Sequence, residues 1–213
     1  MSAAGKLTVT MFLTVDGVYQ APGGPDEDRD GGFQHGGWLV PYLDEDMGRI
    51  VDEAFGKASA FLLGGKTYRI FASHWPRVTD PADQVAAALN RLPKYVVSKT
   101  LAQPEWSPTT VIRGDIAKQV ADLKRRHEGE IQVHGSGALA RLLFAEDLVD
   151  ECHLWTYPVV LGSGKRLFEP GARPAALSLI GTRTTSTGVV VNSYRRAGVP
   201  TYGAFGLETA EQA

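Results

Sequence analysis

The chain has 213 residues, of which 43% are hydrophobic and 22% are charged, and its formal net charge is -2. These ordinary globular values exclude a disordered or fibrous chain and allow one sizeable core. Without a basic excess, the chain lacks the electrostatic footprint of a protein that binds nucleic acid or an anionic membrane. We expect a single domain over residues 1–200, followed by a tail over residues 201–213 that lacks a core pattern.

Cysteine usage and the N-terminal sequence both indicate the cytoplasm. Cys152 is the only cysteine, so no disulfide can form within the chain. Residues 1–6 lead into an alternating segment without the charged, apolar and small-residue regions of an export signal. No apolar run approaches the roughly 20 residues that a membrane-spanning helix needs. We therefore expect a soluble, cytoplasmic protein.

The first elements follow from hydrophobic patterning. Residues 6–15, KLTVTMFLTV, are β-branched and apolar and predict a strand that ends at a turn. Residues 19–37 hold too many Gly, Pro and Asp residues for a regular element, and a loop of this length is usually functional or disordered. Residues 42–55 place apolar side chains at helical spacing, and residues 58–63, ASAFLL, are typical of a buried strand.

The alternation of helix and strand continues toward the C-terminus. The pattern predicts helices at 67–73, 81–92, 115–127 and 138–144 and strands at 94–98, 109–113 and 130–134. Long strands without helices between them follow at 149–160, 177–187 and 189–195. We expect these strands to be antiparallel additions at a sheet edge. The sequence therefore predicts an α/β fold with a mixed, mostly parallel sheet flanked by helices.

Two segments share one design, a strand that meets glycines and then a helix. They are FLLGGKTY at 61–68 and IQVHGSGALA at 131–140. Glycines let the backbone approach an anion closely and the helix N-terminus supplies N–H groups, so two such junctions can hold one pyrophosphate. The alternative is that each glycine pair is only a tight turn. The candidate cofactor-binding residues are Gly64, Gly65, Lys66, Thr67, Gly135, Ser136, Gly137, Ala138 and Leu139.

A third strand end carries Ser98 and Lys99. Their hydroxyl and ammonium groups can grip a ribose phosphate and select NADPH over NADH, although such a pair is also typical of a solvated turn. Residues 135–140 also match the GxGxxA fingerprint of an ordinary dinucleotide-binding fold. That fold is disfavoured because no strand ending in Asp or Glu occurs about 20 residues later, where residues 155–160 read WTYPVV.

Other catalytic chemistries lack the residues that they need. The five histidines are scattered without a pair at metal-ligand spacing, so we expect no metal site. No serine sits in a GxSxG elbow, and Cys152 lies within a predicted strand, where burial is its expected role. His134 ends its predicted strand beside a glycine turn, where it can contact a cofactor or have a purely structural role.

Five motifs follow one another in an order that is more specific than any of them alone. They are TVDGV at 14–18, LGGKTY at 63–68, KYVVSKTL at 94–101, VHGSGALAR at 133–141 and PVVLGSGKRLF at 158–168. Together they resemble the dihydrofolate reductase-like superfamily, specifically the reductase domain of bacterial riboflavin biosynthesis (RibD C-terminal) and its stand-alone relatives. The resemblance implies a three-layer α/β/α fold, bound NADPH, hydride transfer to a flat pteridine-like or pyrimidine-like substrate, and a homodimer.

The resemblance also implies roles for individual residues. Gly65, Lys66 and Thr67 would lie near the phosphates of NADPH. Ser98 and Lys99 would lie near the 2′-phosphate. Residues 135–139 would follow the pyrophosphate toward the nicotinamide.

An acid on the first helix assists protonation of the pterin in dihydrofolate reductases. Counting back from LGGKTY places Gly48 at that position, so true folate reduction is not expected. Asp16 and Asp46 are the candidate catalytic carboxylates. The alternative is that Asp16 forms a turn with Gly17, and that Asp46 and Asp44 are first-turn acids that interact favourably with the positive end of the helix dipole.

The loop at 19–37 occupies the place of a mobile substrate lid in relatives. Trp38 and Tyr42 follow it, and they can stack on substrate or plug the helix entrance. Trp155 and Tyr157 can line the same cleft or belong to the core. The alternative function is a noncatalytic nucleotide or metabolite binder, and the alternative cofactor is another hydride carrier such as a deazaflavin.

Overall fold

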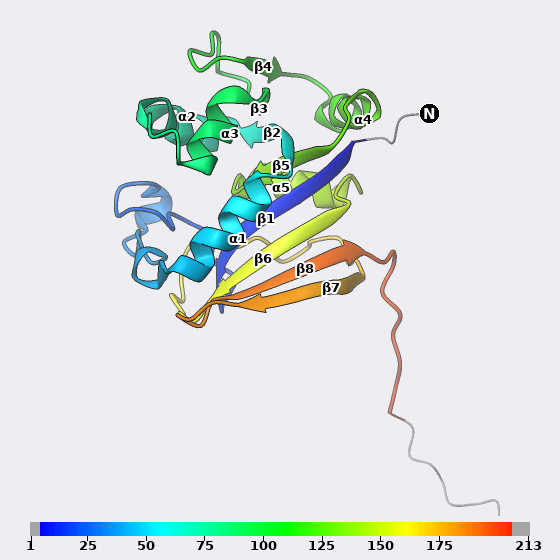
Figure 1. The fold of residues 1–213 in the computed structure, drawn as a ribbon. Helices are drawn as coiled ribbons and strands as arrows, with labels where there is room; N and C mark the ends of the chain where they lie inside the picture. The colour runs from blue at the N-terminus through cyan, green and yellow to red at the C-terminus, as the bar shows by residue number, and fades with distance from the viewer. Residues whose placement is uncertain (1–4, 206–213) are drawn as a thin grey trace, which may run out of the picture.

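The residues that the structure describes, 5–205, fold around one eight-stranded sheet in this computed structural model (Figure 1). The strands are β1 (Lys6–Thr14), β2 (Ala58–Gly64), β3 (Lys94–Val97), β4 (Thr109–Ile112), β5 (Glu130–His134), β6 (Glu151–Tyr157), β7 (Leu177–Thr184) and β8 (Val190–Arg196). The α-helices are α1 (Glu45–Phe55), α2 (Gly65–His74), α3 (Gln84–Arg91), α4 (Ile116–Arg126) and α5 (Gly137–Ala145). These bounds confirm the elements predicted from the sequence to within a few residues at each end. Residues 201–205 of the expected tail carry no helix or strand, and the rest of the tail lies outside the described residues.

Helices cover both faces of the sheet. Neighbouring residues of a strand point to opposite faces. In β2, the buried Leu62 packs with residues of α4 and α5, whereas the buried Phe61 packs with residues of α1, α2 and α3. Figure 1 shows α1 in front of the sheet and α5 behind it. This confirms the predicted α/β class with three layers. No described helix is long and apolar enough to cross a membrane.

The strand order is β4-β3-β2-β5-β1-β6-β8-β7, in which β1 to β6 are parallel and β8 is antiparallel to both of its neighbours. The sequence predicts an antiparallel strand at 149–160, and that prediction is wrong for β6, which pairs with β1 in parallel. The reason is α5, which carries the chain from the end of β5 back across the sheet, so that β6 starts at the same edge as β5. The carboxyl ends of six parallel strands therefore share one edge, where ligands bind in open α/β sheets.

Three of the helices begin with an aspartate cap. Asp44 begins α1, Asp83 begins α3 and Asp115 begins α4, and each carboxylate accepts a hydrogen bond from a first-turn N–H group. Neither α2 nor α5, the helices at the two glycine junctions, has a side-chain cap. Among the hydrogen bonds found in residues 5–205, none joins the first-turn N–H groups of these two helices to a side chain.

Lys94 lies at the start of β3 and is fully buried. Its Nζ donates hydrogen bonds to the carbonyl oxygens of Leu89 (2.7 Å) and Leu92 (3.0 Å), and it lies 4.4 Å from the centroid of the Trp106 ring. Leu89 is in the last turn of α3, whose carbonyl groups have no partner within the helix. Lys94 therefore caps α3 and ties it to the sheet, while burial lowers the pKa of Lys94 to about 8.

We expect Lys94→Met to lower the free energy of unfolding by about 2 kcal/mol, because two buried carbonyl groups lose their donor. The folded-state pKa of about 8 lies below the ordinary 10.5, so the unfolded chain binds more protons between these values and the contribution of Lys94 to stability rises with pH there. The variant should lose this rise. Urea unfolding at several pH values measures both effects, with the exposed Lys118→Met as control, and equal stability of both variants would contradict the capping role.

Candidate functional site

One large cleft, of ≈ 1560 Å³, opens at the carboxyl ends of the parallel strands. β5 lies between β2 and β1 and ends at His134, whereas β1 continues past Thr10, the register partner of His134, to Thr14. Because β5 ends before its neighbour β1, a space opens beyond its last residue, and the end of β5 forms the floor of the cleft between β2 and β1. Residues of the loop at 19–37, α1, α2 and α5 form the walls. The volume exceeds the ~300–1,000 Å³ of a site for one drug-sized ligand, so the cleft has room for two.

The two glycine junctions meet in this cleft. The N–H of Gly64 donates a hydrogen bond to Oγ of Ser136 (2.9 Å), and a Cβ added to Gly135 would lie 3.9 Å from Oγ1 of Thr67. The junctions come together because β2 and β5 are neighbouring parallel strands. All of the junction residues predicted to bind cofactor line the cleft: Gly64, Gly65, Lys66, Thr67, Gly135, Ser136, Gly137, Ala138 and Leu139.

The backbone of the second junction has the shape of an anion cradle. Gly135 (φ 56) and Ser136 (φ 54) both lie in the left-handed region, which turns the chain from β5 into α5. Ala140 donates a hydrogen bond to the Ser136 carbonyl (2.9 Å), and the N–H groups of residues 137–139 precede this bond in the helix. Successive N–H groups after such a turn form a concave site for an anion.

Tyr19, from the loop at 19–37, lies against the start of α5. A Cβ added to Gly137 would overlap the Tyr19 ring, so only glycine at this position lets the loop pack so closely. Sequence reasoning missed Tyr19 because no pattern around it distinguishes it from other loop residues.

Lys66 is held by acids of the loop at 19–37. Its Nζ lies 2.6 Å from a carboxylate oxygen of Asp28 and 2.7 Å from one of Asp30, and Nζ of Lys165 lies 2.8 Å and 2.7 Å from the same two side chains. Hydrogen bonds from Lys165 and Lys66 hold the pKa of Asp30 well below its ordinary range. We call these four residues the loop ion cluster. A phosphate that reaches Lys66 has to compete with the two carboxylates of this cluster.

Ser98 and Lys99, the third predicted cofactor contact, are not among the residues that line the cleft. A Cβ added to Gly65 would lie 3.0 Å from Oγ of Ser98, so the serine is beside the first junction. Its hydroxyl oxygen accepts hydrogen bonds from the N–H groups of Thr100 (3.3 Å) and Leu101 (3.1 Å), which stabilise the turn after β3. Lys99 is exposed next to it.

Of the four aromatic residues predicted to bind substrate, Trp155 lines the cleft. Trp38 and Tyr42 instead pack edge-to-face on Tyr157, with ring centroids 5.3 Å and 5.8 Å away. The indole N–H of Trp38 donates to the carbonyl of Gln20 (2.8 Å). These three side chains hold the loop against α1 and β6 in a buried cluster, which is the core role that the sequence left open.

Asp16 lies at the turn after β1 and outside the cleft lining. Its carboxylate accepts hydrogen bonds from the Thr14 hydroxyl (2.6 Å), the N–H groups of Leu161 (3.2 Å) and Gly162 (2.9 Å), and the Arg166 guanidinium (3.1 Å). Burial opposes ionisation, but the bonds from Thr14 and the two N–H groups lower the pKa of Asp16 to about 2. A carboxylate engaged in this way is poorly suited to deliver a proton near neutral pH.

Asp46 is also absent from the cleft lining. It pairs with Arg49 and accepts a hydrogen bond from the N–H of Ser186 (3.0 Å). Asp44 caps α1 and accepts hydrogen bonds from the Ser186 hydroxyl (2.8 Å) and the Thr187 N–H (3.0 Å). The two acids therefore fix the start of α1 against the turn between β7 and β8.

α1 presents an open space and a carboxylate to the cleft. Gly48, where the resemblance places an acid, lines the cleft, and a Cβ added there would meet nothing within 4 Å. Asp52 follows one helical turn later and also lines the cleft, because residues four apart share one side of a helix. Asp52 thus lies one turn from the position at which the resemblance places an acid. Apolar side chains complete this wall: Phe12, Met47, Val51, Phe55 and Trp155.

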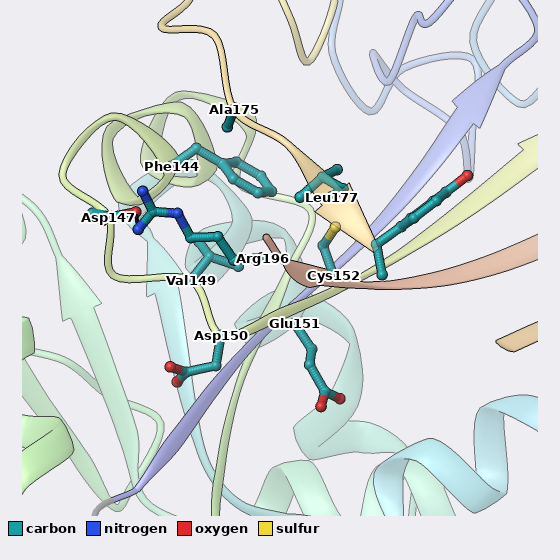
Figure 2. Close-up of a pocket in the computed structure, with 10 residues that line it drawn as sticks. Phe144, Asp147, Val149, Asp150, Glu151, Cys152, Ala175, Leu177 and Arg196 are labelled. Carbon is teal, nitrogen blue, oxygen red and sulfur yellow. Dashed lines mark ion pairs between the residues drawn. The ribbon is translucent and has the colours of Figure 1, made fainter. Parts of the chain in front are cut away.

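A second hollow surrounds Cys152 (Figure 2). Figure 2 shows the thiol pointing toward Leu177, with the Phe144 ring nearby. The volume of ≈ 20 Å³ leaves room for about one water molecule. Cys152 is buried, and burial raises the pKa of its thiol to about 12, so the expected burial is confirmed and the thiol stays protonated.

Comparison with known sequences gives a family match over most of the chain. The model of the RibD C-terminal domain family matches residues 5–191. YyaP, an uncharacterized protein of Bacillus subtilis strain 168, is 27% identical over 187 residues, which cover 87% of this chain and 92% of that protein.

Solved structures share the fold. A putative riboflavin biosynthesis protein from Shewanella sp. PV-4 aligns with a TM-score of 0.67 and 20% identity, over 90% of this chain and 99% of that one. Dihydrofolate reductase from Enterococcus faecalis, complexed with NADP(H) and RAB-propyl, aligns with a TM-score of 0.58 and 11% identity, over 92% of this chain and 99% of that one. The dihydrofolate reductase-like fold that the motifs implied is confirmed.

We expect Asp16→Asn to lower the free energy of unfolding at neutral pH by about 2 kcal/mol, because a charged acceptor of several hydrogen bonds is lost. The folded-state pKa of about 2 lies below the ordinary 3.8, so the carboxylate stabilises the fold above 3.8 and this contribution disappears as the pH falls toward 2. Denaturant unfolding from neutral to acidic pH measures the effect, with the exposed Asp26→Asn as control. A variant as stable as wild type at neutral pH would show that Asp16 does not stabilise the turn.

Proposed function

This chain belongs to the RibD C-terminal domain family, and on that basis we propose that it is a reductase that transfers hydride from NADPH to a small pyrimidine-like or pteridine-like heteroaromatic or carbonyl substrate. The Shewanella relative is described as a riboflavin biosynthesis protein, and the Enterococcus reductase is complexed with NADP(H). Both descriptions support the proposal by analogy of fold.

One observation carries the proposal, the meeting of two uncapped helix N-termini in one cleft. The N–H of Gly64 reaches Oγ of Ser136 across the two junctions, at 2.9 Å. A helix N-terminus favours negative charge through its N–H groups and its dipole, and a pyrophosphate offers negative oxygens to two such ends at once. Lys66 and Thr67 add a cation and a hydroxyl donor. Aspartate carboxylates occupy the corresponding positions on α1, α3 and α4.

The parts of the cleft divide the work of the proposed reaction. Residues 64–67 and 135–139 would hold the phosphates of NADPH, and Ser98 and Lys99, beside the first junction, would hold a 2′-phosphate that extends beyond the cleft lining. Bound NADPH supplies the hydride, and the protein aligns the rings and excludes water. The apolar wall around Trp155 receives a flat substrate. We assign the relay of a proton from water to Asp52, because the carboxylates of Asp16 and Asp46 are engaged elsewhere.

An assay of NADPH oxidation with a panel of pterins, flavin precursors and quinones tests the function. We expect loss of nicotinamide absorbance that requires both the protein and one class of substrate. Calorimetry in parallel separates the alternatives. Tight NADPH binding without any oxidation would favour the noncatalytic nucleotide or metabolite binder. If the protein fails to bind NADPH but binds a deazaflavin, the cofactor assignment changes to the deazaflavin.

The loop ion cluster provides a test of the phosphate position. We expect Lys66→Ala to weaken NADPH binding about tenfold, because a charge-assisted contact to phosphate is lost. Asp30→Asn should strengthen binding roughly threefold, because a competitor for Lys66 loses its charge. Titration calorimetry measures both, with Asp122→Asn on α4 as the matched control. Weaker binding by Asp30→Asn would place the phosphate away from Lys66.

We also propose that two copies pair through β7 to form a homodimer. β7 is an edge strand, and all of its residues are exposed. Leu179 (58% exposed) and Ile180 (42%) lie at its centre. An edge strand with exposed apolar side chains is a template for pairing with another strand, and a two-fold axis lets the same strand serve both copies.

A lysine on that strand should prevent pairing. We expect wild-type protein to show the mass of a dimer in light scattering and Leu179→Lys to show that of a monomer, because a charge on the edge opposes strand addition. Val160→Lys, at an exposed residue outside the sheet, is the control. A wild-type monomer, or a Leu179→Lys variant that stays dimeric, would exclude this interface.

A further inference from the structure

His134 is a buried polar residue in the floor of the cleft that the proposed reaction does not use. It ends β5, lines the cleft and is 8% exposed. Its ring stacks on Phe55 of α1, with centroids 4.5 Å apart and an interplanar angle of 21°. Thr10, its register partner on β1, lines the cleft beside it. His134 therefore stands where the polar junctions meet the apolar wall.

A chain of hydrogen bonds determines which ring nitrogen of His134 carries the proton. The Gln132 amide nitrogen lies 2.7 Å from the carbonyl oxygen of Ala54 and 2.7 Å from Oε1 of Glu130. A carbonyl oxygen can only accept, so the NH₂ group of Gln132 must face it. The amide oxygen of Gln132 then faces Nε2 of His134 at 2.9 Å. Nε2 must therefore donate, and the neutral ring carries its proton on Nε2.

The other nitrogen, Nδ1, is left as an acceptor that faces the cleft. Burial lowers the pKa of His134 to about 3, so the ring is neutral near pH 7 and Nδ1 keeps its lone pair. The hydrogen bonds found among the described residues include none to Nδ1. Every fully buried side-chain nitrogen or oxygen in that part of the chain has a partner, so Nδ1 is not fully enclosed, and the open space that His134 lines is the cleft. A buried acceptor without a donor is costly unless a ligand or water supplies one.

We propose that Nδ1 of His134 accepts a hydrogen bond from an N–H group on a flat heteroaromatic ring bound in the cleft, and that Gln132 and Glu130 hold the tautomer that makes this possible. The ring of Phe55 beside His134 and the apolar wall of the cleft suit a flat ring, and a lone acceptor selects rings that carry an amino, ring N–H or carboxamide group. The inference rests on one part of the proposed function, namely that a substrate ring or the nicotinamide ring binds in this cleft.

Two variants separate the acceptor from the rest of the side chain. His134→Gln can keep an N–H near the Nε2 position, where it reaches Gln132, but has no acceptor at the Nδ1 position. His134→Asn places its amide near the Nδ1 position and can offer an oxygen there. Melting temperatures of both variants check that the fold is retained.

Two pairs of probes identify the source of the N–H group. 2,4-Diaminopyrimidine is compared with pyrimidine, which lacks the amino groups, and NADPH is compared with its analogue that carries an acetyl group in place of the carboxamide. In one of the two pairs, we expect His134→Gln to bind the compound that carries the N–H group about tenfold more weakly than wild type does. The compound of that pair without the N–H group should bind to the variant and to wild type equally well. His134→Asn should retain most of the affinity. A loss for the pyrimidine assigns the contact to the substrate, and a loss for NADPH assigns it to the cofactor.

Nitrogen NMR of the wild-type protein gives a readout that needs no variant. We expect an unprotonated Nδ1 in the free protein, with a resonance that shifts when the N–H probe binds. Unchanged affinities in a folded His134→Gln variant, together with an unshifted Nδ1 resonance, would overturn the inference. If wild type oxidises NADPH in the same experiments, the proposed function still stands. A wild-type protein that binds none of the four probes would overturn both.

Discussion

The parallel pairing of β2 with β5 is the constraint on which the candidate site depends. The two strands are separated by more than sixty residues of chain, yet each leads through glycine into a helix without a side-chain cap. Since parallel neighbours end at the same edge of a sheet, the two helix N-termini open toward one space, and Gly64 and Ser136 bond across it. If another strand lay between β2 and β5, the same two motifs would make two separate turns and no shared cleft.

Local patterns were enough to predict the helices and strands, because the hydrophobic periodicity and the glycine positions of each segment can be read from that segment alone. Strand direction was not available in the same way. The segment at 149–160 reads as a strand, but whether it runs parallel to β1 depends on where α5 delivers the chain, and α5 lies before the strand rather than within it. A residue pattern specifies which face of a strand is buried, whereas its neighbour and direction are set by connections and by competition among all strands.

The site was predictable where chemistry resides in the backbone and less so where it resides in side chains. The glycine junctions line the cleft as expected. Asp16 and Lys66 have residue types suited to catalysis or phosphate binding, but Asp16 bonds to Gly162 and Lys66 bonds to Asp30, contacts that no local pattern encodes. Tyr157 is similar, since its aromatic type suits a substrate contact but the residue lies outside the cleft lining. The role of a versatile side chain is decided by partners distant in sequence.

The cleft separates the groups that supply affinity from the group that supplies selectivity. Helix N-termini attract any phosphate, and the wall around Trp155 accepts any flat apolar ring, so neither discriminates strongly among heterocycles. A pocket that merely fits a ring distinguishes ligands differing by one small group by about 10–200-fold at most, whereas an unpaired buried acceptor penalises every ligand that leaves it without a donor. Nδ1 of His134 becomes such an acceptor when a ring covers it, and its tautomer is held by the hydrogen bond from Nε2 to Gln132. Selectivity for the ring can therefore change through residues 130–134 of β5 while both glycine junctions, and with them the grip on phosphate, stay the same.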